Sequence, residues 1–181
     1  MIDLDTEYKR LSTTSSDIFL HLPRMVDLVE LLDAKHVVEL GSRSGVSTVA
    51  WLHGLKLTGG RLTSIDLDHA PDIGTWSNWE HIQGDDEDPV IVGRVEPADI
   101  VFIDTSHHFG HTVRELNTWR WLVKPGGVIC GHDSELPEPE GAPPGDPRFP
   151  VKRAVEQFVA ENGLQVLWYR DCWGFYVIRG F

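Results

Sequence analysis

The chain has 181 residues, of which 41% are hydrophobic and 24% are charged. This composition is ordinary for a globular protein of one domain, and the length is sufficient for a single well-buried core. The 16 lysine and arginine residues against 28 aspartate and glutamate residues give a formal net charge of −12. Because a duplex-binding protein needs a basic stripe, this balance argues against nucleic acid as a partner.

The sequence also argues against a membrane span and a disulfide framework. No apolar run approaches the ~18 residues that a transmembrane helix needs, and the N-terminus lacks the basic-then-apolar order of a secretory signal. The two cysteines, Cys130 and Cys172, are too few for a disulfide framework or a thiolate metal cage. We therefore expect a soluble, cytoplasmic protein in which residues 1–181 form one domain.

The predicted helices begin after a polar N-terminal stretch. Residues 1–16 are polar and expected to be adaptable, and residues 1–22 together are predicted to cap the domain. A helix should begin at Pro23, because proline favours the first helical position and apolar residues then recur at helical spacing. This helix should end within residues 33–35. Further helices are predicted over residues 44–57, 112–122 and 151–162.

Short apolar runs bounded by turn residues predict the strands. Residues 67–80 are rich in turn formers, and residues 124–127 should form a turn. The predicted strands are residues 36–40, 61–66, 80–83, 100–104, 128–130, 164–169 and 173–178.

The order of these elements predicts an α/β fold. Strands that alternate with helices form a mostly parallel, doubly wound sheet with helices on both faces, here seven-stranded. The last two strands are close enough in sequence to form an antiparallel C-terminal hairpin. Ligands of such sheets bind beyond the carboxyl ends of the strands, where the strand order reverses.

Residues 134–150 interrupt the alternation. Six of the eleven prolines lie between Pro137 and Pro150, which is typical of an extended loop. A loop of this length inside a compact domain is usually a functional lid or a disordered insert. We expect residues 134–150 to form a lid.

The loop that follows the first strand has the sequence ELGSRSGVS, from Glu39 to Ser47. Gly41 permits a tight turn and close approach of a ligand, and the helix start offers free N–H groups. The spacing of Gly41 and Gly45 matches neither the dinucleotide fingerprint nor the phosphate loop. A carboxylate before such a loop suits a ligand with positive charge or hydroxyl donors, although an ordinary strand-to-helix turn would look similar.

Acidic residues end the next two predicted strands. Asp66 lies about 20 residues beyond the glycine loop, where a carboxylate can bind ribose hydroxyls; its alternative role is to cap a turn. Asp85 and Asp86 follow the third strand, where a carboxylate could accept a proton from an adenine amino group. An Asx-type turn explains this last pair equally well.

Two further strand ends carry candidates for chemistry. Asp104 ends the fourth strand in the segment FIDTSHH, and Asp133 follows the fifth in GHDS. Carboxylates from adjacent strand ends can share a hard cation, although helix capping is the alternative. His107 lies in the loop over the same pocket, and a surface position without function is its alternative.

Taken in order, the segments VVELGSRSGVST, LTSIDLD, QGDD, VFIDTSHHF and LVKPGGVICGHDS resemble class I S-adenosylmethionine-dependent methyltransferases. The similarity covers roughly residues 20–180. Within that superfamily the chain resembles the small O-methyltransferases, which include catechol O-methyltransferase-like enzymes and bacterial antibiotic-pathway relatives. The resemblance implies a Rossmann-like fold and S-adenosylmethionine as the cofactor.

The resemblance also implies a cofactor site. Gly41, Ser42, Arg43 and Gly45 would line the methionine moiety with Glu39 beneath them. Ser47 would contact the cofactor carboxylate, Asp66 the ribose, and Asp85 or Asp86 the adenine. Trp79 is a candidate to stack on the adenine ring.

In the enzymes that the chain resembles, carboxylates matching Asp104 and Asp133 bind Mg²⁺, and the position of His107 holds a general base. The next ligand would fall at His132 or Ser134, and His132 would shift the preference toward a borderline transition metal. A free histidine with a pKa near ~6.5 is a poor base for an alcohol. A divalent cation that lowers the acceptor's pKa would remove that mismatch.

The expected function is therefore O-methylation of a small molecule with help from Mg²⁺ or another divalent metal. The alternative is a relative that binds S-adenosylmethionine or a nucleoside without methylating, such as a metal-dependent hydroxylase-like component. The expected partner is a small-molecule acceptor, without nucleic acid or membrane, and a homo-oligomer is left open.

Overall fold

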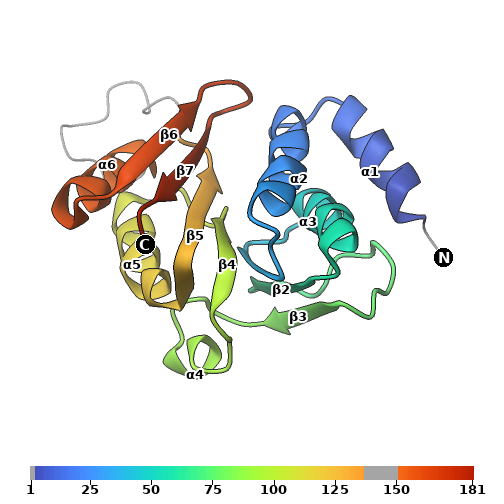
Figure 1. Cartoon of the computed structure of the whole chain (residues 1–181), viewed down its shortest axis with the longest axis horizontal. Coiled ribbons are helices and arrows are strands. Elements are labelled where there is room, and N and C mark those ends of the chain that lie inside the picture. The colour runs from blue at the N-terminus through green and yellow to red at the C-terminus, as the bar shows by residue number, and fades with distance from the viewer. Residues whose placement is uncertain (1–2, 137–150) are drawn as a thin grey trace.

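The computed structural model describes residues 3–136 and 151–181, and its centre is one seven-stranded sheet (Figure 1). The strands lie in the order β3-β2-β1-β4-β5-β7-β6. Strands β1 to β5 run parallel, and β7 runs antiparallel to both of its neighbours, β5 and β6. The strand bounds are His36–Leu40 (β1), Arg61–Asp66 (β2), Trp79–Gln83 (β3), Ala98–Ile103 (β4), Val123–His132 (β5), Gln165–Tyr169 (β6) and Phe175–Arg179 (β7).

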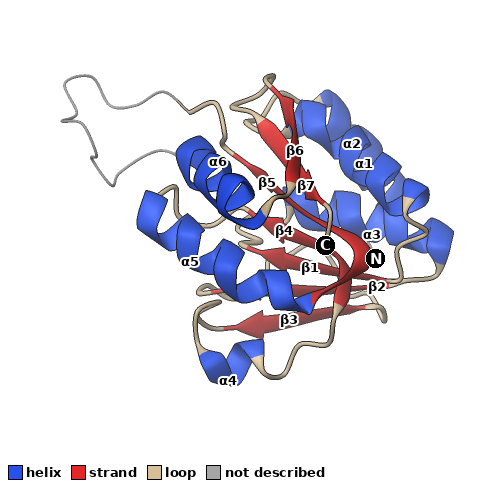
Figure 2. Ribbon diagram, turned by 60° about the vertical axis from the view of Figure 1, so that its left-hand side comes forward, coloured by secondary structure: helices blue, strands red, loops and turns tan. Residues whose placement is uncertain are grey.

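Helices cover both faces of the sheet, as Figure 2 shows. Helices α1, α2 and α3 pack on one face, and α4, α5 and α6 on the other, so each face has its own hydrophobic core. The helix bounds are Leu4–Thr13 (α1), Leu22–Leu31 (α2), Val46–Thr58 (α3), Pro89–Val92 (α4), Phe109–Trp119 (α5) and Val151–Asn162 (α6), with 3₁₀ turns at Phe19–His21 (η1) and Arg120–Leu122 (η2).

The sequence dictates the middle of this sheet through burial. Every residue of β1 is buried, because the strand lies between β2 and β4 with helices on both sides. Such a strand is mostly apolar on both faces, and Val37, Val38 and Leu40 meet this requirement, whereas His36 and Glu39 are buried polar residues. The predicted doubly wound sheet with an antiparallel C-terminal hairpin is confirmed.

Two local predictions were wrong. Residues 124–127 were expected to form a turn, but they lie inside β5, where a shift in the pairing with β4 between Ala98 and Ile100 absorbs the extra residues. Residues 1–16 were expected to be adaptable, but most of them form α1, which docks on α3. Leu4 is buried there, and the ring of Tyr8 stacks on His53 at 4.1 Å.

The predicted lid at 134–150 lies outside the described residues except for its first three. None of the helices in the described ranges is both long and apolar enough to cross a membrane.

The strand order places the ligand edge. Strand order reverses between β1 and β4, since β2 and β3 lie on one side of β1 while β4 and β5 lie on the other. The segments that follow β1 and β4 therefore lead to helices on opposite faces of the sheet, and a crevice forms outside the carboxyl ends of these two strands.

Candidate active site

Two adjoining cavities open at the carboxyl ends of the central strands. The first has a volume of about 470 Å³ and the second about 420 Å³. They share the wall formed by Gly41, Arg43, Asp104 and Thr105. The first extends toward β5 and the β6–β7 connection, and the second toward the ends of β2 and β3. The site is therefore one divided cleft with two compartments.

The loop between β1 and α3 forms the floor of the cleft. Gly41 has a φ of +85°, and a Cβ there would lie 2.1 Å from the backbone oxygen of Asp104. Only glycine fits both the backbone conformation and the space. The predicted cofactor residues Ser42 and Ser47 line the first compartment, and Arg43 lines both. Gly45, with a φ of +83°, provides the left-handed turn into α3.

Asp66 fixes this loop from the end of β2. Its Oδ2 accepts hydrogen bonds from the backbone N–H groups of Ser42 at 2.7 Å and Arg43 at 2.8 Å, and its Oδ1 accepts from Asp68 N–H at 2.9 Å. Burial would raise the pKa of Asp66, but these donors outweigh it and hold the pKa below its usual value. Asp66 also lines the second compartment, so it faces the ligand space and shapes the loop at once.

Glu39 lies beneath the loop and lines neither compartment. Its fully buried carboxylate accepts hydroxyl hydrogen bonds from Ser47 at 2.6 Å, Thr48 at 2.8 Å and Ser64 at 2.6 Å. Burial raises the pKa of Glu39 to about 7, although the three hydroxyls act in the opposite direction. Glu39 therefore supports the start of α3 through Ser47 and Thr48 and does not face the space for a ligand.

Of the residues expected around an adenine, Asp85 and Asp86 line the second compartment. Asp86 is buried, and its Oδ1 lies 3.4 Å from Nε2 of His111 on α5. Trp79 lines neither compartment; its indole N–H donates to Ser64 Oγ at 3.0 Å, and its ring packs into the core beneath α3. The structure therefore does not bring Trp79 to the site, because it stands at the opposite end of β3 from Asp85.

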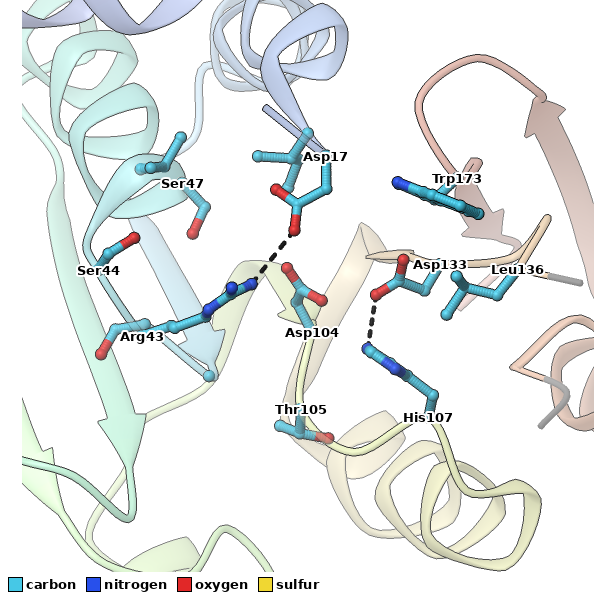
Figure 3. Close-up of a pocket in the computed structure, with 14 residues that line it drawn as sticks. Asp17, Arg43, Ser44, Ser47, Asp104, Thr105, His107, Asp133, Leu136 and Trp173 are labelled. Atoms are coloured by element: carbon cyan, nitrogen blue, oxygen red, sulfur yellow. Dashed lines mark hydrogen bonds and ion pairs between the residues drawn. The ribbon is translucent and has the colours of Figure 1, made fainter. Parts of the chain in front are cut away.

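Asp104, His107 and Asp133 meet in the first compartment, as Figure 3 shows. Nε2 of His107 lies 2.6 Å from Oδ2 of Asp133. One donor atom from each of the three lies within 4.8 Å of the others, the geometry of a possible metal site. The strand ends of β4 and β5 bring the two carboxylates together, as the sequence predicted.

His132 lies behind these carboxylates and is only 3% exposed. Its Nε2 donates to the carbonyl oxygen of Cys172 at 2.7 Å, and its Nδ1 lies 3.3 Å from Asp133 and 3.8 Å from Asp104. The sequence predicted His132 as a metal ligand, whereas the geometry groups His107 with the two aspartates. His132 is the last residue of β5 and lines neither compartment, whereas Asp133 follows the strand with a φ of +62° and faces the first compartment.

Charge is distributed unevenly over this cluster. Burial raises the pKa of Asp104 to about 7. Burial alone would raise the pKa of Asp133, but the hydrogen bonds with His107 and His132 outweigh it. Burial alone would lower the pKa of His132, but the hydrogen bond to Asp133 and the charge of Asp104 outweigh it. The pKa of Asp133 is thus well below its usual value and that of His132 rises to about 9. The hydrogen bond to Asp133 also raises the pKa of His107.

The opposite wall of the first compartment comes from two segments far apart in sequence. Asp17 and Ile18 lie in the connection between α1 and η1, and Trp173 lies in the β6–β7 connection. Trp173 is 47% exposed, and its ring stands over Asp133 in Figure 3. An ion pair of 3.2 Å joins Asp17 to Arg43 across the cleft. The sequence analysis missed Asp17 and Ile18, which follow no recognisable motif.

Backbone strain is concentrated at this compartment. Among the described residues, five other than glycine have a positive φ, and three of them, Arg43, Asp133 and Trp173, line the first compartment. Such conformations persist where the surrounding structure enforces them, and they gather at functional sites.

A family described as a methyltransferase domain matches residues 38–134, more than half of the chain. The chain belongs to this methyltransferase-domain family. The matched segment runs from β1 to the end of β5 and therefore contains the glycine loop, Asp66, Asp104 and Asp133. The predicted resemblance to methyltransferases is confirmed, and no curated protein matches the chain.

Solved structures of methyltransferases share this fold. An SAH-bound methyltransferase of Podospora anserina is 19% identical, with a TM-score of 0.69, and the match covers 100% of this chain and 89% of that one. An O-methyltransferase of Bacillus cereus in complex with SAH is 18% identical, with a TM-score of 0.65 and coverage of 98% and 91%. MycE, a methyltransferase of the mycinamycin biosynthetic pathway in complex with Mg, SAH and mycinamycin VI, is 19% identical, with a TM-score of 0.71 and coverage of 99% and 54%.

Proposed function

We propose that this methyltransferase-domain protein transfers the methyl group of S-adenosylmethionine to a hydroxyl oxygen of a small molecule, assisted by a divalent cation. One observation carries the proposal: the compartment lined by Asp66 and Asp85 adjoins, through Gly41, the compartment that holds Asp104, His107 and Asp133. We call the second compartment, lined by Asp66 and Asp85, the nucleoside compartment, and the first, with Asp104, His107 and Asp133, the acceptor compartment. The nucleoside of S-adenosylmethionine bound in the nucleoside compartment would direct its sulfonium toward the acceptor compartment. The SAH bound by the P. anserina and B. cereus structures, which share the fold, supports this choice of cofactor.

Each part of the cofactor would be bound by a different group of residues in the cleft. Asp66 and the loop it holds would bind the ribose and the methionine part of the cofactor, while Asp85 and Asp86 stand where the adenine would lie. Alignment of the two reacting atoms by such a cleft can supply ~7–11 kcal/mol of the barrier to an in-line displacement. The cofactor supplies an activated methyl group on sulfur.

The donor set fits a divalent cation. Asp104 and Asp133 place two carboxylates together in a recessed site, and burial raises the pKa of Asp104, so a cation there would stabilise its charged form. Oxygen ligands suit Mg²⁺, and the nearby imidazole of His107 also suits a borderline transition metal. Bound there, a cation would lower the pKa of an acceptor hydroxyl.

His107 is positioned to accept the hydroxyl proton as the oxygen–carbon bond forms and the carbon–sulfur bond breaks. Asp133 holds the ring in place through Nε2, so Nδ1 is the ring nitrogen that would accept the proton. The two carboxylates and the cleft are equally compatible with a metal-dependent hydroxylase-like component, but the methyltransferase family match favours methyl transfer.

The acceptor compartment suggests a small molecule. Its volume of about 470 Å³ suits a ligand of drug-like size, and Trp173 offers a flat apolar face. MycE, of the same fold, is complexed with mycinamycin VI, a small molecule. The net charge of −12 disfavours a polyanionic partner. We also propose a cytoplasmic location, since Cys130 and Cys172 are both free; a homo-oligomer is compatible with this assignment.

Calorimetric titration with S-adenosylmethionine tests the proposal. The unaltered protein should bind it, and incubation with a panel of small hydroxylated molecules and Mg²⁺ or Mn²⁺ should yield S-adenosylhomocysteine and a methylated acceptor, detected by mass spectrometry. Absence of binding by a folded sample that responds to another nucleotide would contradict it.

Asp66→Ala should weaken binding of S-adenosylmethionine at least ~10-fold, since hydrogen bonds to a charged group are worth ~1.5–3 kcal/mol. Titration of the variant beside Asp72→Asn measures this. Asp72 is an exposed acidic residue that lines neither compartment, so its variant should bind the cofactor as the unaltered protein does. Equal affinities for all three proteins would remove the role of Asp66.

A further inference from the structure

A second cluster of ionisable side chains lies beside the nucleoside compartment, on the far side from Asp133. It consists of Asp86, after β3, and of His111 and Glu115 on α5. Oδ1 of Asp86 lies 3.4 Å from Nε2 of His111, which lies 3.9 Å from Oε1 of Glu115. One donor atom of each residue lies within 4.8 Å of the other two.

Among the described residues, the only cation beside this cluster's two carboxyl groups is His111, whose pKa the hydrogen bond to Asp86 raises to about 9. Glu115 has no exposed surface and Asp86 is 6% exposed, yet neither forms an ion pair with a described lysine or arginine. Oε1 of Glu115 accepts a hydrogen bond from the hydroxyl of Thr105 at 2.5 Å. Oε2 of Glu115 is buried and receives no hydrogen bond from any described group. A buried carboxylate oxygen without a partner is costly.

The surroundings orient the donor atoms as a metal site requires. The hydroxyl of Ser106 contacts Nδ1 of His111, which leaves Nε2 directed at the two carboxylates. Metal-binding histidines are commonly held in this way, through the nitrogen that does not bind the ion, and ligating carboxylates are likewise hydrogen-bonded from outside. Thr105 provides that second contact for Glu115.

The distances and spacing favour a zinc-type ion. His111 and Glu115 are four residues apart on α5, so both side chains lie on one face of the helix. Ligand atoms at about 2.0 Å from a tetrahedral zinc lie about 3.3 Å from each other. The 3.4 Å between Asp86 and His111 is close to this value, and the 3.9 Å between His111 and Glu115 is somewhat longer. His111 lines the second compartment and a further cavity of about 430 Å³, which gives an ion a path of entry.

We propose that Asp86, His111 and Glu115 bind one divalent transition-metal ion of the zinc type, separate from the methyl-transfer centre. The ion would join the loop after β3 to α5, the two segments that wall the nucleoside compartment. Its two positive charges would match the two buried carboxylates. The site would thus stabilise the fold and that wall without taking part in methyl transfer.

Metal-stripped protein titrated with Zn²⁺ alone tests this proposal by calorimetry and by thermal unfolding. Glu115→Gln should bind one Zn²⁺ fewer per chain than the unaltered protein and lose most of the Zn²⁺-dependent rise in Tm. His111→Gln should do the same. Without metal, Glu115→Gln should unfold no earlier than the unaltered protein, because it removes an unpartnered buried carboxylate; this separates ligand loss from misfolding.

Glu87→Gln is the matched control. Glu87 lies 3.9 Å from His111 and pairs with Arg114 at 2.6 Å, so the variant makes the same change of charge beside the site without removing a ligand. It should keep the full Zn²⁺ stoichiometry. Equal stoichiometry in the unaltered protein and in Glu115→Gln, or an equal loss in Glu87→Gln and Glu115→Gln, would overturn the proposal.

Discussion

At the scale of single residues, the site pairs each imidazole with a carboxylate. His107 contacts Asp133 in the acceptor compartment, and His111 contacts Asp86 beside the nucleoside compartment. In both places the hydrogen bond to the carboxylate raises the pKa of the imidazole, whereas burial acts in the opposite direction. Clusters of side chains with shifted pKa values in a cleft are typical of functional sites. Substitutions of residues adjacent to them in sequence serve as control variants.

His107→Gln should lower the rate of methyl transfer by ~10²–10⁴-fold, the usual contribution of a positioned base. The affinity for S-adenosylmethionine should change little, because His107 does not line the nucleoside compartment. Single-turnover rates and calorimetry on the same preparations measure the two effects. His108→Gln is the control, since His108 is the exposed neighbour; a variant at His107 with full activity would eliminate it as the base.

At the scale of elements, the loop between β1 and α3 is set by contacts with two other strands. Asp66 at the end of β2 binds its backbone N–H groups, and the carbonyl of Asp104 at the end of β4 fills the space beside Gly41. The position of the loop therefore depends on Asp66, which lines the second compartment, and on Asp104, which lines both compartments.

Gly41→Ala should destabilise the protein by more than the ~1–2 kcal/mol that a left-handed alanine costs, because its Cβ would lie 2.1 Å from the Asp104 carbonyl oxygen. Chemical denaturation measures the loss. Gly126→Ala isolates the backbone cost, since Gly126 has a similar φ of +81° and no atom within 4 Å of the added Cβ. Equal destabilisation by both variants would show that the close approach at Gly41 is unimportant.

At the scale of the whole molecule, stability depends on ionisable groups buried far from the cleft. His36, at the start of β1, is 2% exposed. Its Nδ1 donates to the Pro97 carbonyl at 3.2 Å and its Nε2 accepts from the Thr63 hydroxyl at 3.1 Å, a set that satisfies the neutral ring. Burial lowers the pKa of His36, and Arg61 nearby acts in the same direction, whereas Asp99 opposes it.

This lowered pKa predicts a loss of stability in acid. The unfolded chain takes up a proton at His36 below pH ~6.5 while the folded protein does not, so the stabilisation is complete above that pH and declines below it. The decline approaches ~1.4 kcal/mol per pH unit at most. His36→Gln should show a shallower fall in the free energy of unfolding between pH 7.5 and 5.5, measured by urea denaturation. Parallel curves would contradict the assignment.

The sequence by itself determined most of the strands, the doubly wound class of the sheet and the edge at which the candidate functional residues gather. Period and turn residues are local signals, so β1, β2 and α6 could be predicted nearly to the residue. Acidic residues at strand ends then pointed to the cleft, because parallel strands bring their carboxyl ends to one edge.

Only the tertiary structure decided which side chains meet there. Local patterns do not report that Asp17 crosses to Arg43, that His132 turns its Nε2 to the Cys172 carbonyl, or that Asp86 meets Glu115. These contacts join segments far apart in the chain, and their geometry follows from how helices and loops pack on the finished sheet. The arrangement of the functional side chains in this cleft therefore depends on tertiary packing between segments far apart in the chain, which the spacing of residues in the sequence does not predict.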